Sequence, residues 1–265
     1  MKEQTILAKK MSALLDLNRK PVGVKLVYSK EEYDIYDARE LVAPLEYCVS
    51  VKSAGLGNSI KFVHKNSGCG GSTCALGFQP PADEFYDGRQ GCRLGLFKDP
   101  AVAEKTNSQV SILKKPLYGV IVKPLEDFTE TEPDVVIIVA AAREVMRLLQ
   151  GYTCTYGLQP RLAASGNQAI CVECTAYPML TGDMNLSMLC SGTRYLAKWK
   201  DSEAAIGIPY AKFGGLVEGV RNSSNGTEPD NRKAEIIEKL KELECDTADL
   251  VYGDAYYIKL KNNKK

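Results

Sequence analysis

The stretch Asp134-Val-Val-Ile-Ile-Val-Ala140 decides the fold that we expect of this chain. A continuous β-branched run of this length is typical of a central strand that is buried on both faces of a sheet. The residues that follow, 141–149, place Val145, Leu148 and Leu149 on one side of a helix. The strand therefore leads directly into a helix, which is one half of a βαβ unit.

Further strand and helix patterns surround this run. Two longer strands are expected over residues 22–28 and 117–122, and shorter ones over 59–64, 168–172 and 204–208. Helical spacing of apolar residues occurs over 3–17, 45–54, 186–199, 213–220 and 231–244. We expect one domain over residues 1–265 of the α/β (or α+β) class, with a mixed sheet flanked by helices and a C-terminal helix at 231–244.

The regions between these elements carry three further expectations. Residues 78–106 are rich in Gly, Pro and Asp, which predicts a long functional loop covering a pocket, and 29–40 and 222–230 are expected to be polar loops. The tyrosine-rich tail, 251–260, has the pattern of a last strand. The apolar side of 186–199 and this tail are candidate surfaces for a homodimer.

A weak internal similarity links two segments. Cys48 precedes Ser-Ala-Gly-Leu-Gly-Asn58, and Cys154 precedes Ala-Ala-Ser-Gly-Asn167. Each segment is followed by a short strand pattern and a cysteine pair. The match is compatible with two duplicated halves, 20–115 and 116–220, around a shared cleft, and also with coincidence over a dozen small residues.

Composition limits the partners of the chain. Its 265 residues are 45% hydrophobic and 25% charged, and the net charge is +1, so no basic surface for nucleic acid or anionic lipid is expected. No apolar run is long enough to span a membrane, and the N-terminal residues lack a signal-peptide pattern, which predicts a cytoplasmic location. The single histidine, His64, restricts a metal site to thiolates and carboxylates.

The nine cysteines are the chemical signature of the sequence. They fall into two groups and one outlier, Cys245: the first group is Cys48, Cys69, Cys74 and Cys92, and the second is Cys154, Cys171, Cys174 and Cys190. Thiols stay reduced in the cytoplasm, so these residues are expected to be metal ligands or buried thiols rather than disulfides.

An iron–sulfur cluster of the 4Fe-4S type is the site that we expect. Thiolates favour such clusters, and the glycines of Cys69-Gly-Gly-Ser-Thr-Cys74 allow the tight turn that ligands of one cluster need. The first group is the preferred ligand set because it is compact and glycine-rich. The second group could hold another cluster or complete one shared site. Arg93 and Arg194 are candidate partners of the anionic cluster or of a carboxylate substrate.

Other interpretations of the cysteines remain open. Neither group matches a complete cluster motif, and structural zinc, a dithiol redox pair at Cys171 and Cys174, or metal-free thiols of the kind an anaerobe tolerates are the alternatives. With a cluster, the chain is either an oxidoreductase or electron carrier acting on a small molecule, or a non-catalytic protein that senses a metal, cluster or haem-like ligand.

Several motifs together resemble domain-of-unknown-function family 169, a bacterial and archaeal family. They are Lys20-Pro-Val-Gly-Val-Lys25, Cys48 with Ala54 and Gly57, Cys69-Gly-Gly71 with Leu76-Gly77, Pro133-Asp-Val-Val-Ile137, Leu186-Ser-Met-Leu-Cys190-Ser-Gly192 with Arg194, and Ile206-Gly-Ile-Pro209. The resemblance extends over residues 11–220 and implies one continuous domain, but it implies no activity. Four cysteines lie outside these motifs, so their expected role rests on spacing alone: Cys74, Cys92, Cys171 and Cys174.

Overall fold

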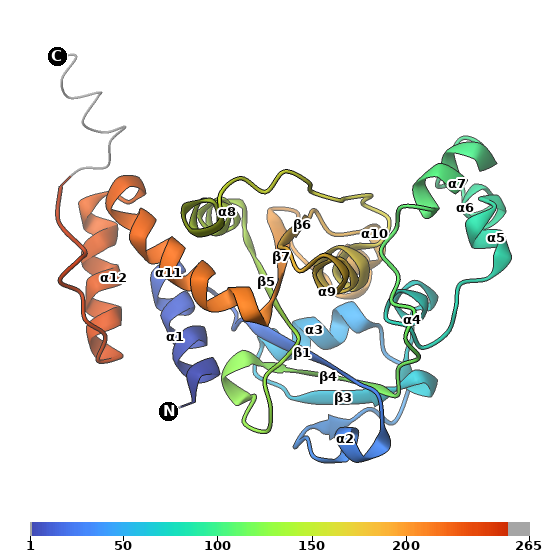
Figure 1. Ribbon diagram of the computed structural model, residues 1–265, viewed down its shortest axis with the longest axis horizontal. Coiled ribbons are helices and arrows are strands. Elements are labelled where there is room, and N and C mark those ends of the chain that lie inside the picture. The colour runs from blue at the N-terminus through green and yellow to red at the C-terminus, as the bar shows by residue number, and fades with distance from the viewer. Residues whose placement is uncertain (1, 254–265) are drawn as a thin grey trace.

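A computed structural model describes residues 2–253 and contains one seven-stranded sheet (Figure 1). The strand order is β2-β3-β4-β1-β5-β7-β6. The strands are β1 Val22–Val27, β2 Arg39–Glu40, β3 Ile60–Val63, β4 Gly119–Pro124, β5 Val135–Ala141, β6 Asn185–Ser187 and β7 Glu203–Pro209. Only β2 and β3 pair in parallel, so the sheet is mixed, as expected for this single α/β domain.

The central strand β5 is buried on both faces, which confirms the prediction from its β-branched run. Val136 and Ile138 pack into a core beneath α1 (Glu3–Leu15), α8 (Ala142–Tyr156), α11 (Tyr210–Thr227) and α12 (Asp230–Glu242). Val135 and Ile137 pack into a second core on the opposite face. Both neighbours of β5 are antiparallel to it, so the strand and α8 are not half of a parallel βαβ unit.

The two halves of the sheet are built alike. Strand β1 pairs with β4 so that Val22 lies opposite Pro124, and β5 pairs with β7 so that Val135 lies opposite Pro209. The residue after each proline donates its N–H to the residue before each valine: Leu125 to the Pro21 carbonyl and Tyr210 to the Asp134 carbonyl. Strands β3 and β6 then flank β4 and β7 at matching positions.

A helical layer covers the second core and carries the cysteines of interest. It comprises α3 (Tyr47–Gly55), α4 (Gly70–Ala75), the π-helix η3 (Ala169–Ala176) and α10 (Ser191–Leu196), with α9 (Tyr177–Thr181) continuing η3. In each half, the chain runs from the central strand through a cysteine-bearing helix to the outer strand. It returns through a short helix to the strand between them.

Several predicted boundaries are wrong for identifiable reasons. Residues 168–172 are not a strand but begin η3, and 186–199 divides into β6 and α10 because Leu186 pairs with Ile206 of β7. The predicted loop at 78–106 contains three helices, α5 (Asp83–Tyr86), α6 (Arg89–Arg93) and α7 (Pro100–Asn107). They stand at the opposite end of the molecule from α11 and α12 (Figure 1).

Two further segments that were expected to be loops contain helical residues. Residues 29–40 contain α2 (Lys30–Asp34), and α11 extends into the polar loop that was expected at 222–230. Residues 2–253 also contain two 3-10 turns, η1 (His64–Asn66) and η2 (Leu125–Asp127). Of the strand predicted at 251–260, residues 254–260 lie outside the described part. None of the helices between residues 2 and 253 is long and apolar enough to cross a membrane.

Candidate functional site

Four cysteines from both sequence groups come together on one face of the sheet. Cys48 lies in the first turn of α3, Cys69 caps the N-terminus of α4, Cys171 lies in η3, and Cys190 caps the N-terminus of α10. Helix α3 contacts both α10 and η3, and α4 contacts η3. All four residues are partly exposed, although burial dominates the environment of the Cys48 and Cys171 thiols. The halves of the sheet therefore each contribute two thiols to one place.

Charge on neighbouring thiols contributes to the raised pKa of two of the four cysteines. Burial raises the pKa of the Cys48 thiol to about 11, and charge on Cys190 and Cys69 adds to the rise. Burial also raises the pKa of Cys171 well above its usual range, with further contributions from charge on Cys69, Cys190 and Cys48. Without a bound cation, these two thiols are therefore protonated at neutral pH. A site that held all four as thiolates would require a cation.

Thr193 joins two of the four thiols. Its hydroxyl lies 3.0 Å from Cys190 Sγ, and its backbone N–H donates to the same sulfur over 3.4 Å. A hydrogen bond from Thr193 to Cys48 lowers the pKa of that thiol and partly offsets the effect of burial. The Thr193 backbone N–H is thus a hydrogen-bond donor beside the Cys190 sulfur at this end of the site.

The π-helix η3 lies close against β7. A Cβ at Gly207 would come within 2.0 Å of the Cys174 carbonyl oxygen, so only glycine permits this approach. The Thr175 hydroxyl donates to the Ile170 carbonyl and lies 2.9 Å from the Tyr47 hydroxyl of α3. Since π-helices are rare and occur mainly at functional sites, this wide turn is consistent with a role in placing Cys171.

Glu173 stabilises the segment that leads into η3. Its buried carboxylate accepts hydrogen bonds from the backbone N–H groups of Ser165 (2.7 Å) and Gly166 (3.2 Å) and from the Ser187 hydroxyl (2.5 Å). The carboxylate thereby ties the 165–168 segment to β6. Three donors to a buried carboxylate are worth more than neutral hydrogen bonds, which makes Glu173 a structural anchor of the site.

The other five cysteines are not part of this group. Two of them lie beside it: charge on Cys69 adds to the effect of burial in raising the pKa of Cys74, and Cys174 shares η3 with Cys171. The Cys74 sulfur faces Gln79 and the Pro80 carbonyl, and Cys174 is buried against β7. The remaining three are dispersed: Cys92 is on α6, Cys154 is exposed on α8, and Cys245 packs near α12. Neither sequence group forms a site by itself.

The two candidate arginines have other partners. Arg93 forms an ion pair with Glu84 of α5 at 2.8 Å, and both side chains are largely exposed. Arg194 donates to three backbone carbonyls, those of Lys200 (2.6 Å), Met188 (2.8 Å) and Glu203 (3.1 Å). It therefore fastens both ends of the segment that carries Cys190. His64 stacks on Phe78 with 5.8 Å between ring centroids.

The four sulfurs are not arranged to hold a single ion. Within residues 2–253, no three side chains of His, Cys, Asp or Glu form such a group. One tetrahedral zinc ion would draw four sulfurs within about 4 Å of each other, given Zn–S bonds of about 2.3 Å. A cubane cluster binds each thiolate through a different iron and therefore requires a wider set.

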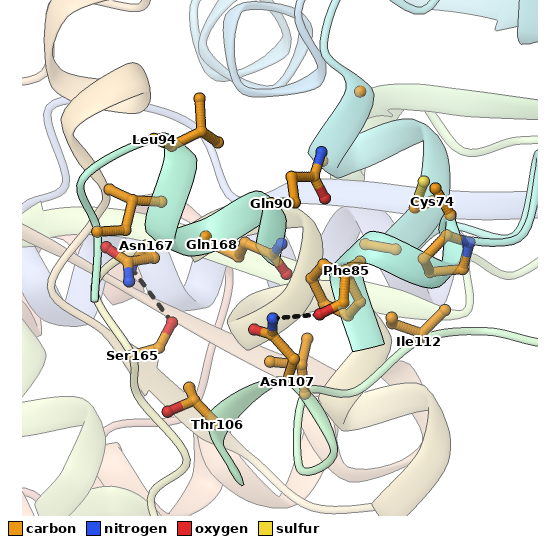
Figure 2. A pocket seen from close by; sticks show the side chains of 18 of the residues that line it. Cys74, Phe85, Gln90, Leu94, Thr106, Asn107, Ile112, Ser165, Asn167 and Gln168 are labelled. Carbon is orange, nitrogen blue, oxygen red and sulfur yellow. Dashed lines mark hydrogen bonds between the residues drawn. The ribbon is translucent and has the colours of Figure 1, made fainter. Parts of the chain in front are cut away.

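A cavity of about 400 Å³ lies beside Cys69. Its walls come from α4, from the three helices at 83–107, and from the 165–168 segment that Glu173 holds (Figure 2). We call α5, α6 and α7 the lid. The lid joins the body where Leu113 and Leu117 donate their N–H groups to the carbonyls of Ala75 and Gly77. The predicted pocket beneath 78–106 is therefore present.

Sequence reasoning missed the residues that organise the site. Glu173, Thr193 and Gln168 carry no motif by themselves: Glu173 binds backbone groups and a serine 14 residues away, and the roles of Thr193 and Gln168 depend on which helices the fold brings to the thiols and the cavity. One available signal was the likeness of Cys69-Gly-Gly-Ser-Thr to Cys190-Ser-Gly-Thr. Each segment begins a short helix, α4 or α10. The next strand after each helix, β4 or β7, lies between the other two strands of its half.

Comparison with known proteins places the chain in a family without a described activity. A sequence profile described as "DUF169: Uncharacterised ArCR, COG2043" matches residues 10–219. An uncharacterised protein of Methanocaldococcus jannaschii, MJ0308, is 28% identical over 222 residues, which cover 81% of this chain and 92% of that protein. No solved structure matches the chain.

Proposed function

The chain belongs to the DUF169 family, and we propose that it binds a 4Fe-4S cluster through Cys48, Cys69, Cys171 and Cys190. The observation that carries this proposal is the convergence of four thiols from four separate elements. A set made only of thiolates is a soft ligand set, which suits iron and sulfide.

The helical surroundings support a cluster at this position. Two of the cysteines occupy N-cap positions and a third lies in a first turn, close to backbone N–H groups that have no acceptor within their own helix. The Thr193 N–H is one such group, and it donates to the Cys190 sulfur. Hydrogen bonds to the sulfurs stabilise the anionic cluster and raise its reduction potential.

The adjacent cavity favours electron transfer with a small molecule over a purely structural cluster. Cys69 contributes to the cavity wall, so a molecule in the cavity would lie next to one corner of the cluster. A non-catalytic sensor would use the same site. The two functions are distinguished by measuring whether the cluster reversibly oxidises the bound molecule, which only the enzyme would do.

Iron and sulfide analysis of anaerobically reconstituted protein tests the proposal. We expect about four irons per chain and absorbance near roughly 400 nm. Single Cys→Ser substitutions at the four proposed ligands should each lower the iron content by at least about half, because a corner of the cubane loses its thiolate. The matched controls are Cys74→Ser, Cys92→Ser and Cys154→Ser, which should retain iron.

Three outcomes would contradict the proposal. Iron-free protein after reconstitution would favour metal-free thiols. One zinc ion per chain without sulfide would favour a structural metal. Loss of iron in Cys74→Ser and Cys92→Ser, but not in Cys171→Ser or Cys190→Ser, would return the site to the first sequence group.

A further inference from the structure

The cavity beside Cys69 has a definite chemical character. Apart from two cysteine thiols, its lining has no side chain that ionises. Aromatic and aliphatic side chains form most of the surface, including Phe85, Phe97, Leu94 and Ile112. An ionised group placed here would lose its hydration without gaining a counter-ion, which is costly. The cavity therefore selects against charged molecules.

Carboxamides supply the polar part of the lining. Gln168 and Gln90 reach the cavity from the 165–168 segment and from the lid, and Figure 2 shows the Gln168 amide directed toward the space near Phe85. Asn107 donates to the Phe85 carbonyl over 2.6 Å, which fixes both residues in the lid. An apolar cavity with a few placed polar groups is typical of a small-molecule site.

The side-chain oxygen of one of these amides lacks a hydrogen-bond donor. The Oε1 atom of Gln168 is covered by neighbouring atoms and accepts no hydrogen bond within the described residues, so a rotation of the side-chain amide would bring it to a donor in the cavity. A buried acceptor without a donor costs on the order of 1–3 kcal/mol, which a ligand N–H or O–H would recover. The volume of about 400 Å³ lies within the usual range of about 300–1,000 Å³ for ligand sites.

We propose that this cavity binds an uncharged, largely apolar molecule whose N–H or O–H group donates to Gln168. Binding in the cavity does not depend on the cluster. The inference rests on the proposed function only for the role of the bound molecule as redox partner of the cluster. The apolar walls bind the body of the molecule, the lid excludes water from it, and Gln168 fixes its orientation. Anionic analogues of the same shape are rejected.

A pair of fluorescent probes tests this selectivity on the full-length, metal-free chain. N-phenyl-1-naphthylamine is uncharged, carries one N–H donor, and becomes fluorescent in apolar surroundings. 8-Anilino-1-naphthalenesulfonate has the same ring system and N–H group with an added sulfonate. We expect saturable binding of the amine and at least about tenfold weaker binding of the sulfonate, because the sulfonate charge cannot be paired in the cavity.

Three variants locate the binding. Gln168→Leu should weaken binding of the amine about tenfold, because it removes the hydrogen-bond acceptor. Ile112→Trp should abolish binding, because the larger side chain fills the cavity. Gln109→Leu changes an exposed glutamine outside the cavity and should leave binding unchanged. Equal binding of both probes, or amine binding unaffected by both cavity variants, overturns the inference.

Iron content, measured separately, keeps the two proposals apart. Selective binding of the amine by a protein that never takes up iron would leave the cavity proposal standing and refute the cluster. Full iron loading without selective binding of the amine would support the cluster and refute the cavity proposal. For this purpose, the cavity variants are also reconstituted with iron and sulfide, and each should retain about four irons.

Discussion

Replacing Gly207 with alanine tests the contact that positions η3. The added Cβ would lie 2.0 Å from the carbonyl oxygen of Cys174, 2.4 Å from its Cα and 2.5 Å from its carbonyl carbon. All three neighbours are backbone atoms, so no side chain can rotate away. Strand β7 or the π-helix must move by on the order of 1 Å to restore ordinary contact, and a well-packed interior resists such a shift.

The expected loss is at least about 3 kcal/mol of unfolding free energy, the upper end of the usual cost of overpacking. For a domain of this size, that lowers the melting temperature by about 6–12 °C. Gly214→Ala, within α11, is the matched control. Its added Cβ would make an ordinary contact of 3.8 Å with the Leu7 side chain. This control should be neutral or stabilising by up to about 1 kcal/mol.

Anaerobic urea denaturation of both variants, with iron analysis of the folded protein, provides the assay. Gly207→Ala should lose stability and also iron, since Cys171 belongs to the helix that packs against β7 at this contact. Stability equal to that of Gly214→Ala would refute the packing argument. Full iron content in a destabilised Gly207→Ala would refute the coupling between β7 and the thiol site.

Three further predictions concern other residues of the site. Glu173→Gln should cost about 1.5–3 kcal/mol in urea denaturation, because a neutral amide replaces the charged acceptor of three hydrogen bonds; an unchanged midpoint would contradict its anchoring role. Arg194→Lys should lower iron content while the circular dichroism spectrum is retained, because an ammonium cannot replace the planar fork that binds three carbonyls; full loading of this variant would show that the fork is dispensable. Alkylation of Cys48 in metal-free protein, followed by peptide mass spectrometry, should keep accelerating from pH 9 to about 11, because its raised pKa keeps it protonated where an ordinary cysteine is already ionised; a plateau by pH 9 would contradict that pKa.

The sheet was largely predictable because its strands have strong local signals. β-branched runs at β1, β4 and β5 have no competing helical pattern, and the burial of both faces of β5 follows from its continuous apolar run. The strand predicted at 168–172 failed for a physical reason. A short apolar run such as Ala169-Ile-Cys-Val172 satisfies either a strand or a buried helix, and only its packing against β7 decides between them.

The ligand set could not be predicted from spacing. Compactness in sequence favoured the first cysteine group, but the antiparallel pairing of β1 with β5 brings residues more than a hundred positions apart onto one face. The sequence similarity aligned Cys48 with Cys154, yet α8 covers the opposite face of the sheet. The sheet register instead makes η3, and hence Cys171, the counterpart of α3.

This correspondence gives the proposed cluster a place in the architecture. The seam between the halves is the pairing of β1 with β5, which has three residue pairs, whereas β5 and β7 share seven. Each half contributes one thiol from a cysteine-bearing helix and one from a helix cap. A cluster bound by all four would therefore connect the halves through metal–sulfur bonds, in addition to this short strand pairing. Because metal binding adds free energy only to the folded arrangement of its ligands, the cluster would stabilise the seam as well as serve the adjoining cavity.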